Sequence, residues 1–125
     1  MAERRSNTLL VDDDDDVAAA MVAALEVEGY FVVRASDGEE ALRALRDGLS
    51  ASLIVLDLFM PWMDGIEFRR IQGSDPTISP VPVIVVSGLA SRMNEIRSMG
   101  VARCFRKPFD VDELLCAVNE LCPAA

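Results

Sequence analysis

Short runs of consecutive apolar residues recur along the chain. Three of them, at 7–12, 52–57 and 81–88, each contain at least three consecutive aliphatic residues, which is typical of strands buried on both faces of a sheet. The run at 30–35 is rich in β-branched and aromatic residues, and we expect two further strands there and at 101–106. The pattern therefore predicts five strands.

The segments between these runs repeat apolar residues at helical spacing. In 15–28, Val17, Met21 and Leu25 share one face, and Gly29 follows as a C-terminal cap. Strands that alternate with helices predict an α/β fold, here a single doubly wound domain (1–125, core about 7–121) around a five-stranded parallel sheet. The other expected helices are 37–48, 66–71, 91–99 and 110–121, with loops at 61–65 and 73–80.

Composition excludes several classes of function. A formal net charge of −9 over 125 residues argues against direct contact with nucleic acid, which requires a basic surface. No apolar run approaches the roughly 20 residues of a membrane span, and the first residues lack the apolar region of a signal peptide. We therefore expect a cytoplasmic protein that does not contact membranes. Three cysteines without a CxxC pair are typical of reduced thiols.

The chain has no histidine, so its chemistry must use carboxylates, hydroxyls, arginine or its single lysine. Four of the five predicted strands end in such a residue. The first ends at Asp12 and Asp13, the third at Asp57, the fourth at Ser87 and the fifth at Lys107, whereas the second offers nothing obvious. In an open parallel sheet these ends share one edge, where ligands bind.

Three adjacent carboxylates require a cation, and Mg²⁺ suits them because it binds one or two protein carboxylates together with water and phosphate oxygens. Lys107 and Ser87 can then contact a phosphoryl group, the first as a point charge and the second as a hydrogen-bond donor. Asp57 remains as a nucleophile that forms an aspartyl phosphate. The pattern thus indicates phosphoryl transfer to Asp57.

The segments "LLVDDDDDV", "IVLDLFMPWMDG", "VIVVSG" and "FRKPF" resemble the motifs of the response-regulator receiver domain of two-component signalling, in the family's order and spacing. The resemblance covers about residues 7 to 121, and the DxxMPxMDG pattern with a later KPF is its most specific part. It implies a flavodoxin-like (βα)5 domain with strand order 2-1-3-4-5. It also implies that a partner histidine kinase or histidine phosphotransfer protein phosphorylates Asp57.

The resemblance further implies that Asp13, Asp57 and the Phe59 carbonyl ligate Mg²⁺ directly, that Asp12 acts through a bound water, and that the Lys107–Pro108 bond is cis. Such a domain is not an enzyme in the usual sense, because it catalyses only its own phosphorylation and dephosphorylation. Its output would be the binding of a downstream protein, which the sequence does not identify. The sequence also leaves open whether the chain forms a homodimer. Because the chain begins with Met and shows no tail, we expect a stand-alone domain.

Three alternative functions can be compared with the receiver interpretation by the residues that each one requires. A haloacid-dehalogenase-type phosphatase needs a second aspartate two residues after the nucleophile, where this chain has Phe59. An EF-hand loop that starts at Asp12 would need Gly and Glu where Val17 and Ala23 stand. A degenerate receiver that acts as a phosphorylation-independent interaction module would be expected to have lost the strand-end residues, all of which are present.

Two features depart from the receiver pattern. Most receivers have Tyr or Phe three residues before the lysine, as a switch residue that moves together with the hydroxyl residue, here Ser87. This chain has Cys104 there, and the adjacent Phe105 must face the opposite side of the strand. The segment from 87 to 100 is also about two residues short, so we expect a short or irregular fourth helix.

Overall fold

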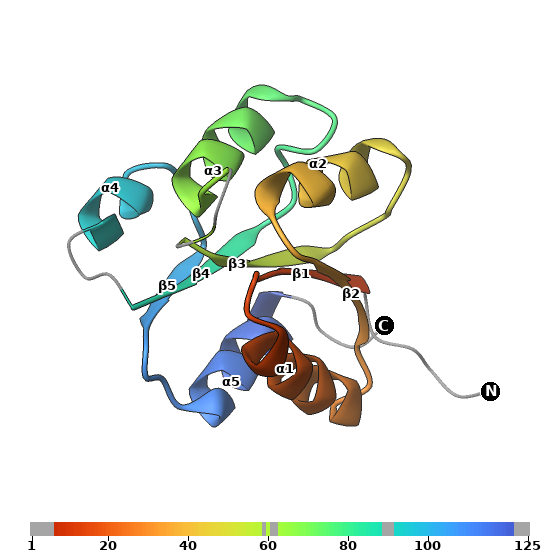
Figure 1. Cartoon of the computed structure of the whole chain (residues 1–125), viewed down its shortest axis with the longest axis vertical. Helices are drawn as coiled ribbons and strands as arrows, with labels where there is room; N and C mark the ends of the chain where they lie inside the picture. The colour runs from red at the N-terminus through yellow and green to blue at the C-terminus, as the bar shows by residue number, and fades with distance from the viewer. Residues whose placement is uncertain (1–6, 59, 61–62, 89–91, 122–125) are drawn as a thin grey trace.

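The structure is a computed structural model that describes residues 7–58, 60, 63–88 and 92–121. This part of the chain alternates strands and helices along its whole length (Figure 1). The strands are β1 (Asn7–Val11), β2 (Phe31–Ala35), β3 (Leu53–Asp57), β4 (Val83–Ser87) and β5 (Arg103–Arg106). The helices are α1 (Asp15–Val27), α2 (Gly38–Arg46), α3 (Gly65–Ser74), α4 (Met93–Arg97) and α5 (Val111–Leu121).

All neighbouring strands pair in parallel, in the order β2-β1-β3-β4-β5. Helices α1 and α5 cover one face of this sheet, and α2, α3 and α4 cover the other (Figure 1). The predicted doubly wound fold and its strand order are therefore confirmed. The strand order reverses at β1, which lies between β2 and β3, and the carboxyl ends of β1 and β3 meet at this switch point.

The hydrophobic core forms two layers, one on each side of the sheet. Strands β3 and β4 are buried along their whole length, as their continuous apolar sequences predict. Because successive side chains point to opposite faces, Leu9 and Val11 pack under α2, whereas Leu10 packs against α1 and α5. This double burial holds the strand ends rigidly at one edge of the sheet.

Helix α3 is longer than the sequence indicated, because it continues through Gly73 to Ser74 instead of ending at residue 71. Gly and Ser are weak helix formers, so the sequence favoured an earlier end. Side-chain hydrogen bonds stabilise the last turn. The buried Gln72 amide donates hydrogen bonds to two carbonyls of the following loop, and the Ser74 hydroxyl donates one to Arg70, one turn earlier.

Helix α4 is the shortest of the five helices in the described residues, in agreement with the prediction of a short fourth helix. Its few residues still anchor it, because Met93 and Ile96 are buried in the same layer as α2 and α3. A helix of this length is stable only through its packing. The position of α4 on the sheet therefore depends on these two apolar contacts.

Candidate functional site

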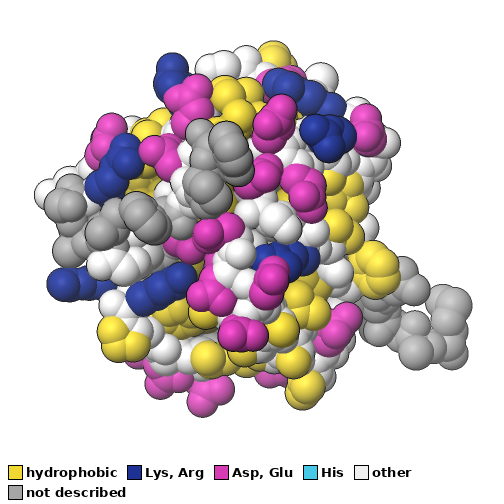
Figure 2. Space-filling model, in the orientation of Figure 1, with side chains coloured by type: hydrophobic (Ala, Val, Ile, Leu, Met, Phe, Trp, Pro, Cys, Tyr) yellow, Lys and Arg dark blue, Asp and Glu magenta, His cyan; other side chains and the backbone are white. Residues whose placement is uncertain are grey.

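The strand-end residues that the sequence singled out converge at the switch point of the sheet. Asp12 and Asp13 directly follow β1, and Asp57 is the last residue of β3. Ser87 ends β4, and Lys107 follows β5. Acidic side chains gather across the middle of the molecular face shown in Figure 2, where β1 leads into α1.

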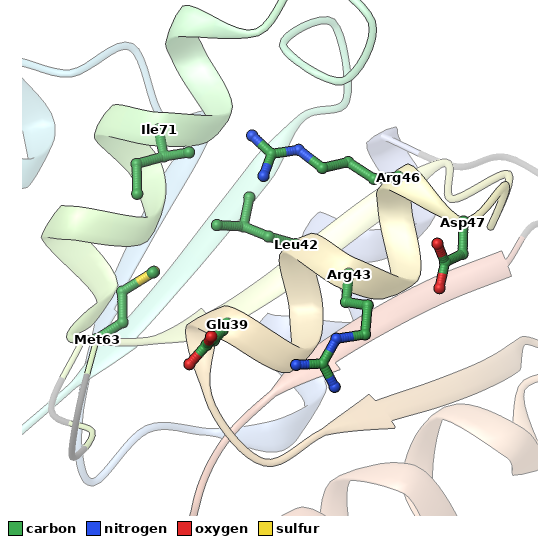
Figure 3. Close-up of a pocket in the computed structure, with 7 residues that line it drawn as sticks. All are labelled: Glu39, Leu42, Arg43, Arg46, Asp47, Met63 and Ile71. Atoms are coloured by element: carbon green, nitrogen blue, oxygen red, sulfur yellow. The ribbon is translucent and has the colours of Figure 1, made fainter.

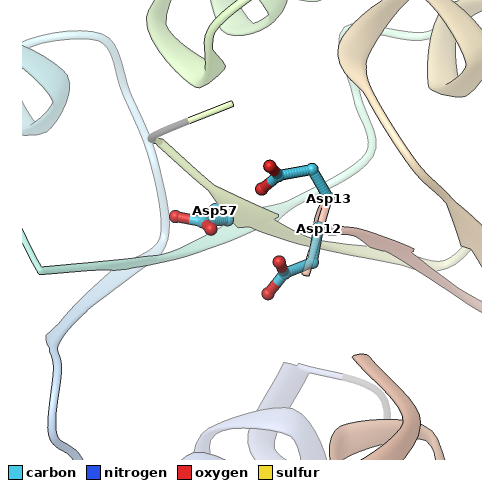
Figure 4. Close-up of side chains that lie close together, drawn as sticks. All are labelled: Asp12, Asp13 and Asp57. Carbon is cyan, nitrogen blue, oxygen red and sulfur yellow. The ribbon is translucent and has the colours of Figure 1, made fainter. Parts of the chain in front are cut away.

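The carboxylates of Asp12, Asp13 and Asp57 form the closest group in this region. One oxygen from each lies within 4.8 Å of the others, and the three side chains converge from the ends of β1 and β3 (Figure 4). Asp12 is fully buried and Asp57 is 5% exposed, whereas Asp13 is exposed to solvent. Solvent therefore reaches the cluster at Asp13.

Asp12 has an unusual environment for a carboxylate. Its Oδ1 accepts a hydrogen bond of 2.9 Å from the Asp14 amide, but its buried Oδ2 has no hydrogen-bond donor among the described residues. Burial raises the pKa of Asp12; the negative charges of Asp57 and Asp13 raise it further, while the Asp14 amide and Lys107 oppose the increase. A buried oxygen without a donor, beside two more carboxylates, fits a bound hard cation such as Mg²⁺.

Lys107 supplies the positive charge of the site. Its Nζ lies 3.4 Å from Asp57 Oδ2 and 4.0 Å from Asp12 Oδ2. The Lys107 amide donates a hydrogen bond of 2.8 Å to the Ser87 carbonyl, which joins the end of β5 to the end of β4. The predicted cis bond between Lys107 and Pro108 is confirmed.

The remaining aspartates of the acidic run begin α1. The Asp14 side chain accepts hydrogen bonds from the amides of Asp16 and Val17, as an N-cap does. Asp15 and Asp16 occupy the first helical turn, where negative charge stabilises the positive end of the helix dipole. The run therefore combines a pair of carboxylates at the site with a helix start.

The start of α3 lies directly against the end of β3. The Gly65 amide donates a hydrogen bond of 2.9 Å to the Leu58 carbonyl, and a Cβ at Gly65 would lie 2.8 Å from the Asp57 carbonyl oxygen. The preceding residue, Asp64, caps α3 and also pairs with Arg92 at 3.1 Å. This ion pair joins the start of α3 to the start of α4.

Strand β2 contributes to the site through a residue that was not predicted from the sequence. Arg34, near the end of that strand, donates two hydrogen bonds to the Asp12 carbonyl and one to the Asp15 carboxylate. The only signal was a single charged residue within an otherwise apolar strand sequence. Phe59, expected to offer its carbonyl to the metal, and Trp62 lie outside the described residues.

The switch position has the predicted geometry on β5. Cys104 is partly buried in the layer of α2, α3 and α4, whereas Phe105 packs in the opposite layer. The prediction that Phe105 belongs to the core is therefore confirmed. Burial raises the pKa of the Cys104 thiol, and the nearby Arg97 guanidinium opposes this increase.

A separate groove of about 460 Å³ lies between α2 and α3 (Figure 3). Its floor is apolar, with Leu42, Met63 and Ile71, and charged side chains of α2 form its wall. Arg46 spans it, since its Nε lies 3.4 Å from Asp75 at the end of α3. None of the strand-end residues lines this groove, so it is distinct from the carboxylate cluster.

Comparisons with known proteins show the family of this chain. Residues 8–119 match the family described as the response regulator receiver domain. The chain is 33% identical over 97 residues to sporulation initiation phosphotransferase F of Bacillus subtilis, covering 77% of each protein. It is 34% identical over 99 residues to the DNA-binding dual master transcriptional regulator RpaA of Synechocystis, covering 78% of this chain but 41% of RpaA.

A solved structure supports the same assignment. The response regulator protein TrrA of Thermotoga maritima, in complex with Mg²⁺-BeF, superposes with a TM-score of 0.83 at 27% identity, and the match covers 93% of this chain and 98% of that one. The chain belongs to the response-regulator receiver domain family of two-component systems. Within the described residues, no helix has the length and apolar character needed to cross a membrane.

Proposed function

We propose that this receiver domain is the phosphoacceptor of a two-component phosphorelay, with Asp57 as the phosphorylated residue. The observation that carries the proposal is the arrangement around Asp57, where two further carboxylates lie within 4.8 Å and Lys107 Nζ lies 3.4 Å from Oδ2. A nearly buried carboxylate beside both a cation site and a lysine is suited to accept a phosphoryl group.

The donor is a phosphohistidine of a partner histidine kinase or histidine phosphotransfer protein, because this chain has no histidine of its own. An oxygen of Asp57 attacks the phosphorus and forms the acyl phosphate. The phosphorus–nitrogen bond breaks, and its electron pair stays on the partner's imidazole. The Bacillus relative is a sporulation initiation phosphotransferase, which is consistent with such a relay.

Each neighbouring side chain contributes to this transfer. Lys107 attracts the phosphoryl oxygens, and the Ser87 hydroxyl donates a hydrogen bond to one of them. Asp13 and Asp57, with the Phe59 carbonyl, would hold Mg²⁺ directly, and Asp12 would hold it through water. When bound, the ion neutralises the negative charge that develops during transfer. The buried and otherwise unsatisfied Asp12 Oδ2 supports a cation at this position.

Phosphorylation then acts through the binding of a downstream protein, with Ser87 and the β5 position of Cys104 as the switch. We propose that the chain acts in the cytoplasm as one domain, without touching nucleic acid or membrane. Its catalysis is limited to its own phosphorylation and dephosphorylation. The rival function, an interaction module independent of phosphorylation, predicts no phosphate uptake at all.

The test is incubation with Mg²⁺ and acetyl phosphate, followed by intact-mass measurement. Wild-type protein should gain one phosphoryl group that is labile in base, and Asp57→Asn should gain none. Asp47→Asn, which removes an exposed carboxylate at the end of α2, is the matched control and should behave as wild type. Equal labelling of Asp57→Asn, or no labelling of folded wild type with any donor, would contradict the proposal.

A further inference from the structure

The guanidinium group of Arg34 forms a forked set of hydrogen bonds, here called the fork, between β2 and the start of α1. Its Nε and Nη2 donate hydrogen bonds of 3.1 and 2.8 Å to the backbone carbonyl of Asp12. Its Nη1 lies 2.7 Å from Asp15 Oδ1. The Arg34 side chain is 26% exposed, whereas that of Asp15 is 87% exposed. The fork therefore joins a partly buried backbone contact to a solvent-facing ion pair.

The hydrogen bonds from Arg34 to the Asp12 carbonyl take the place of a backbone hydrogen bond that the β1–β2 ladder lacks. The parallel ladder between β1 and β2 continues to the Asp12 amide, which donates to the Ala35 carbonyl at 3.1 Å. The next hydrogen bond of a parallel ladder would be donated by the amide of Asp37 to the Asp12 carbonyl. The chain turns away before that point, since Asp37 caps α2 with its side chain. The Arg34 guanidinium satisfies the Asp12 carbonyl instead.

The Asp12 carbonyl belongs to the peptide unit that links the first two carboxylates of the cluster. Rotation of this unit would move the side chains of both Asp12 and Asp13 relative to Asp57. We propose that Arg34, held by Asp15, is a positioning residue that fixes this peptide and thereby keeps the carboxylate cluster in the geometry that binds a divalent cation. The inference rests on the proposed function only in taking that cation as Mg²⁺.

This proposal also explains why the acidic run extends beyond the two residues at the cluster. Asp14 caps α1, and Asp15 orients the guanidinium that holds Asp12. Groups behind the ligands of a metal site typically contribute about 10- to 100-fold to metal affinity, because they orient the ligands. Arg34 acts in this way through the backbone, without contacting the cation.

The positive charge of Arg34 and its positioning role predict opposite effects of its removal on Mg²⁺ affinity, which makes the inference testable. Arg34 brings a positive charge close to a cation site, so its removal should strengthen Mg²⁺ binding if only charge matters. If Arg34 positions the Asp12–Asp13 peptide, removal should weaken binding. Arg34→Met removes the charge and the fork, whereas Arg34→Lys keeps the charge but replaces the planar fork with one ammonium.

The measurement is Mg²⁺ titration without phosphodonor, followed by fluorescence of Trp62, the single tryptophan, five residues after Asp57 in the sequence. Both Arg34→Met and Arg34→Lys should weaken Mg²⁺ binding about tenfold. Asp15→Ala should weaken it less than about fivefold, because the exposed ion pair contributes little. Arg46→Met, which breaks an ion pair between α2 and α3, is the matched control and should bind as wild type.

A second readout follows the peptide itself. In metal-free protein, the carbonyl-carbon resonance of Asp12 and the amide resonance of Asp13 should shift in Arg34→Met and Arg34→Lys but not in Arg46→Met. Stronger Mg²⁺ binding by Arg34→Met, or unchanged binding by Arg34→Lys with unchanged Asp12 and Asp13 resonances, would overturn the inference. A wild type that binds Mg²⁺ but takes up no phosphate would refute the proposed function alone, and one that binds no Mg²⁺ would refute both.

Discussion

Gly65 allows the start of α3 to lie against the end of the strand that carries Asp57, and replacing it with alanine should destabilise the fold. An added Cβ would lie 2.7 Å from Leu58 Cα and 2.8 Å from both the Asp57 carbonyl oxygen and Leu58 Cδ2. Two of these three atoms belong to the backbone of a buried strand end and cannot move independently. Helix α3 must therefore shift away from β3.

The magnitude follows from three contributions. Overpacking of this kind costs about 1–3 kcal/mol. A shift of α3 also weakens the hydrogen bond between the Gly65 amide and the Leu58 carbonyl, which contributes about 1 kcal/mol. The greater helix propensity of alanine offsets about 1 kcal/mol. The free energy of unfolding of Gly65→Ala should therefore be lower than that of wild type by about 1–3 kcal/mol.

Gly73→Ala provides a matched control in the same helix. There the atoms nearest to the added Cβ belong to the flexible Arg69 side chain, the closest being Nη1 at 3.2 Å. The gain in helix propensity should offset this small conflict, so the free energy of unfolding should stay within about 1 kcal/mol of wild type.

Urea denaturation followed by far-UV circular dichroism measures both variants at the same pH and without Mg²⁺. The free energy of unfolding of Gly65→Ala should be lower than that of Gly73→Ala by at least about 1 kcal/mol. Equal stabilities, or a Gly65→Ala protein as stable as wild type, would refute the close approach of α3 to β3.

Three further predictions concern single side chains. Without Mg²⁺, Asp12→Asn should raise the melting temperature because it removes a buried charge beside two carboxylates, and Mg²⁺ should then no longer stabilise the protein; a lower melting temperature would contradict this. Hydrogen bonds from Thr77 lower the pKa of Asp75, so Asp75→Asn should reduce stability at pH 7, and its difference from wild type should close as pH falls through the folded pKa; a pH-independent difference would refute it. At the switch, Cys104 lacks a ring, so beryllofluoride should shift amide resonances around 103–105 less in wild type than in Cys104→Tyr; equal shifts would show that the ring is not needed.

The sequence by itself determined the order of strands and helices and the residues at which most strands end. This was possible because a strand buried on both faces needs an unbroken apolar run, and the first charged residue after it must lie at the edge of the sheet. Asp12 and Asp57 were found in this way. The opposite orientations of Cys104 and Phe105 also followed from the alternation of side chains along a strand, and the structure agrees. The short α4 followed from the resemblance to receiver domains, whose corresponding segment is longer.

Only the tertiary structure decided features that depend on contacts between one element and the segments packed against it. The end of α3 depends on hydrogen bonds from Gln72 to the loop that follows, which outweigh the weak helix propensity of Gly73. The contact of Arg34 with Asp12 depends on the register that pairs Val11 with Ala35 and on the early departure of β2 from the ladder. Hydrophobic periodicity records which face of an element is buried, but not which neighbour lies beside it or how the two are aligned, and those contacts set the geometry of the carboxylate cluster.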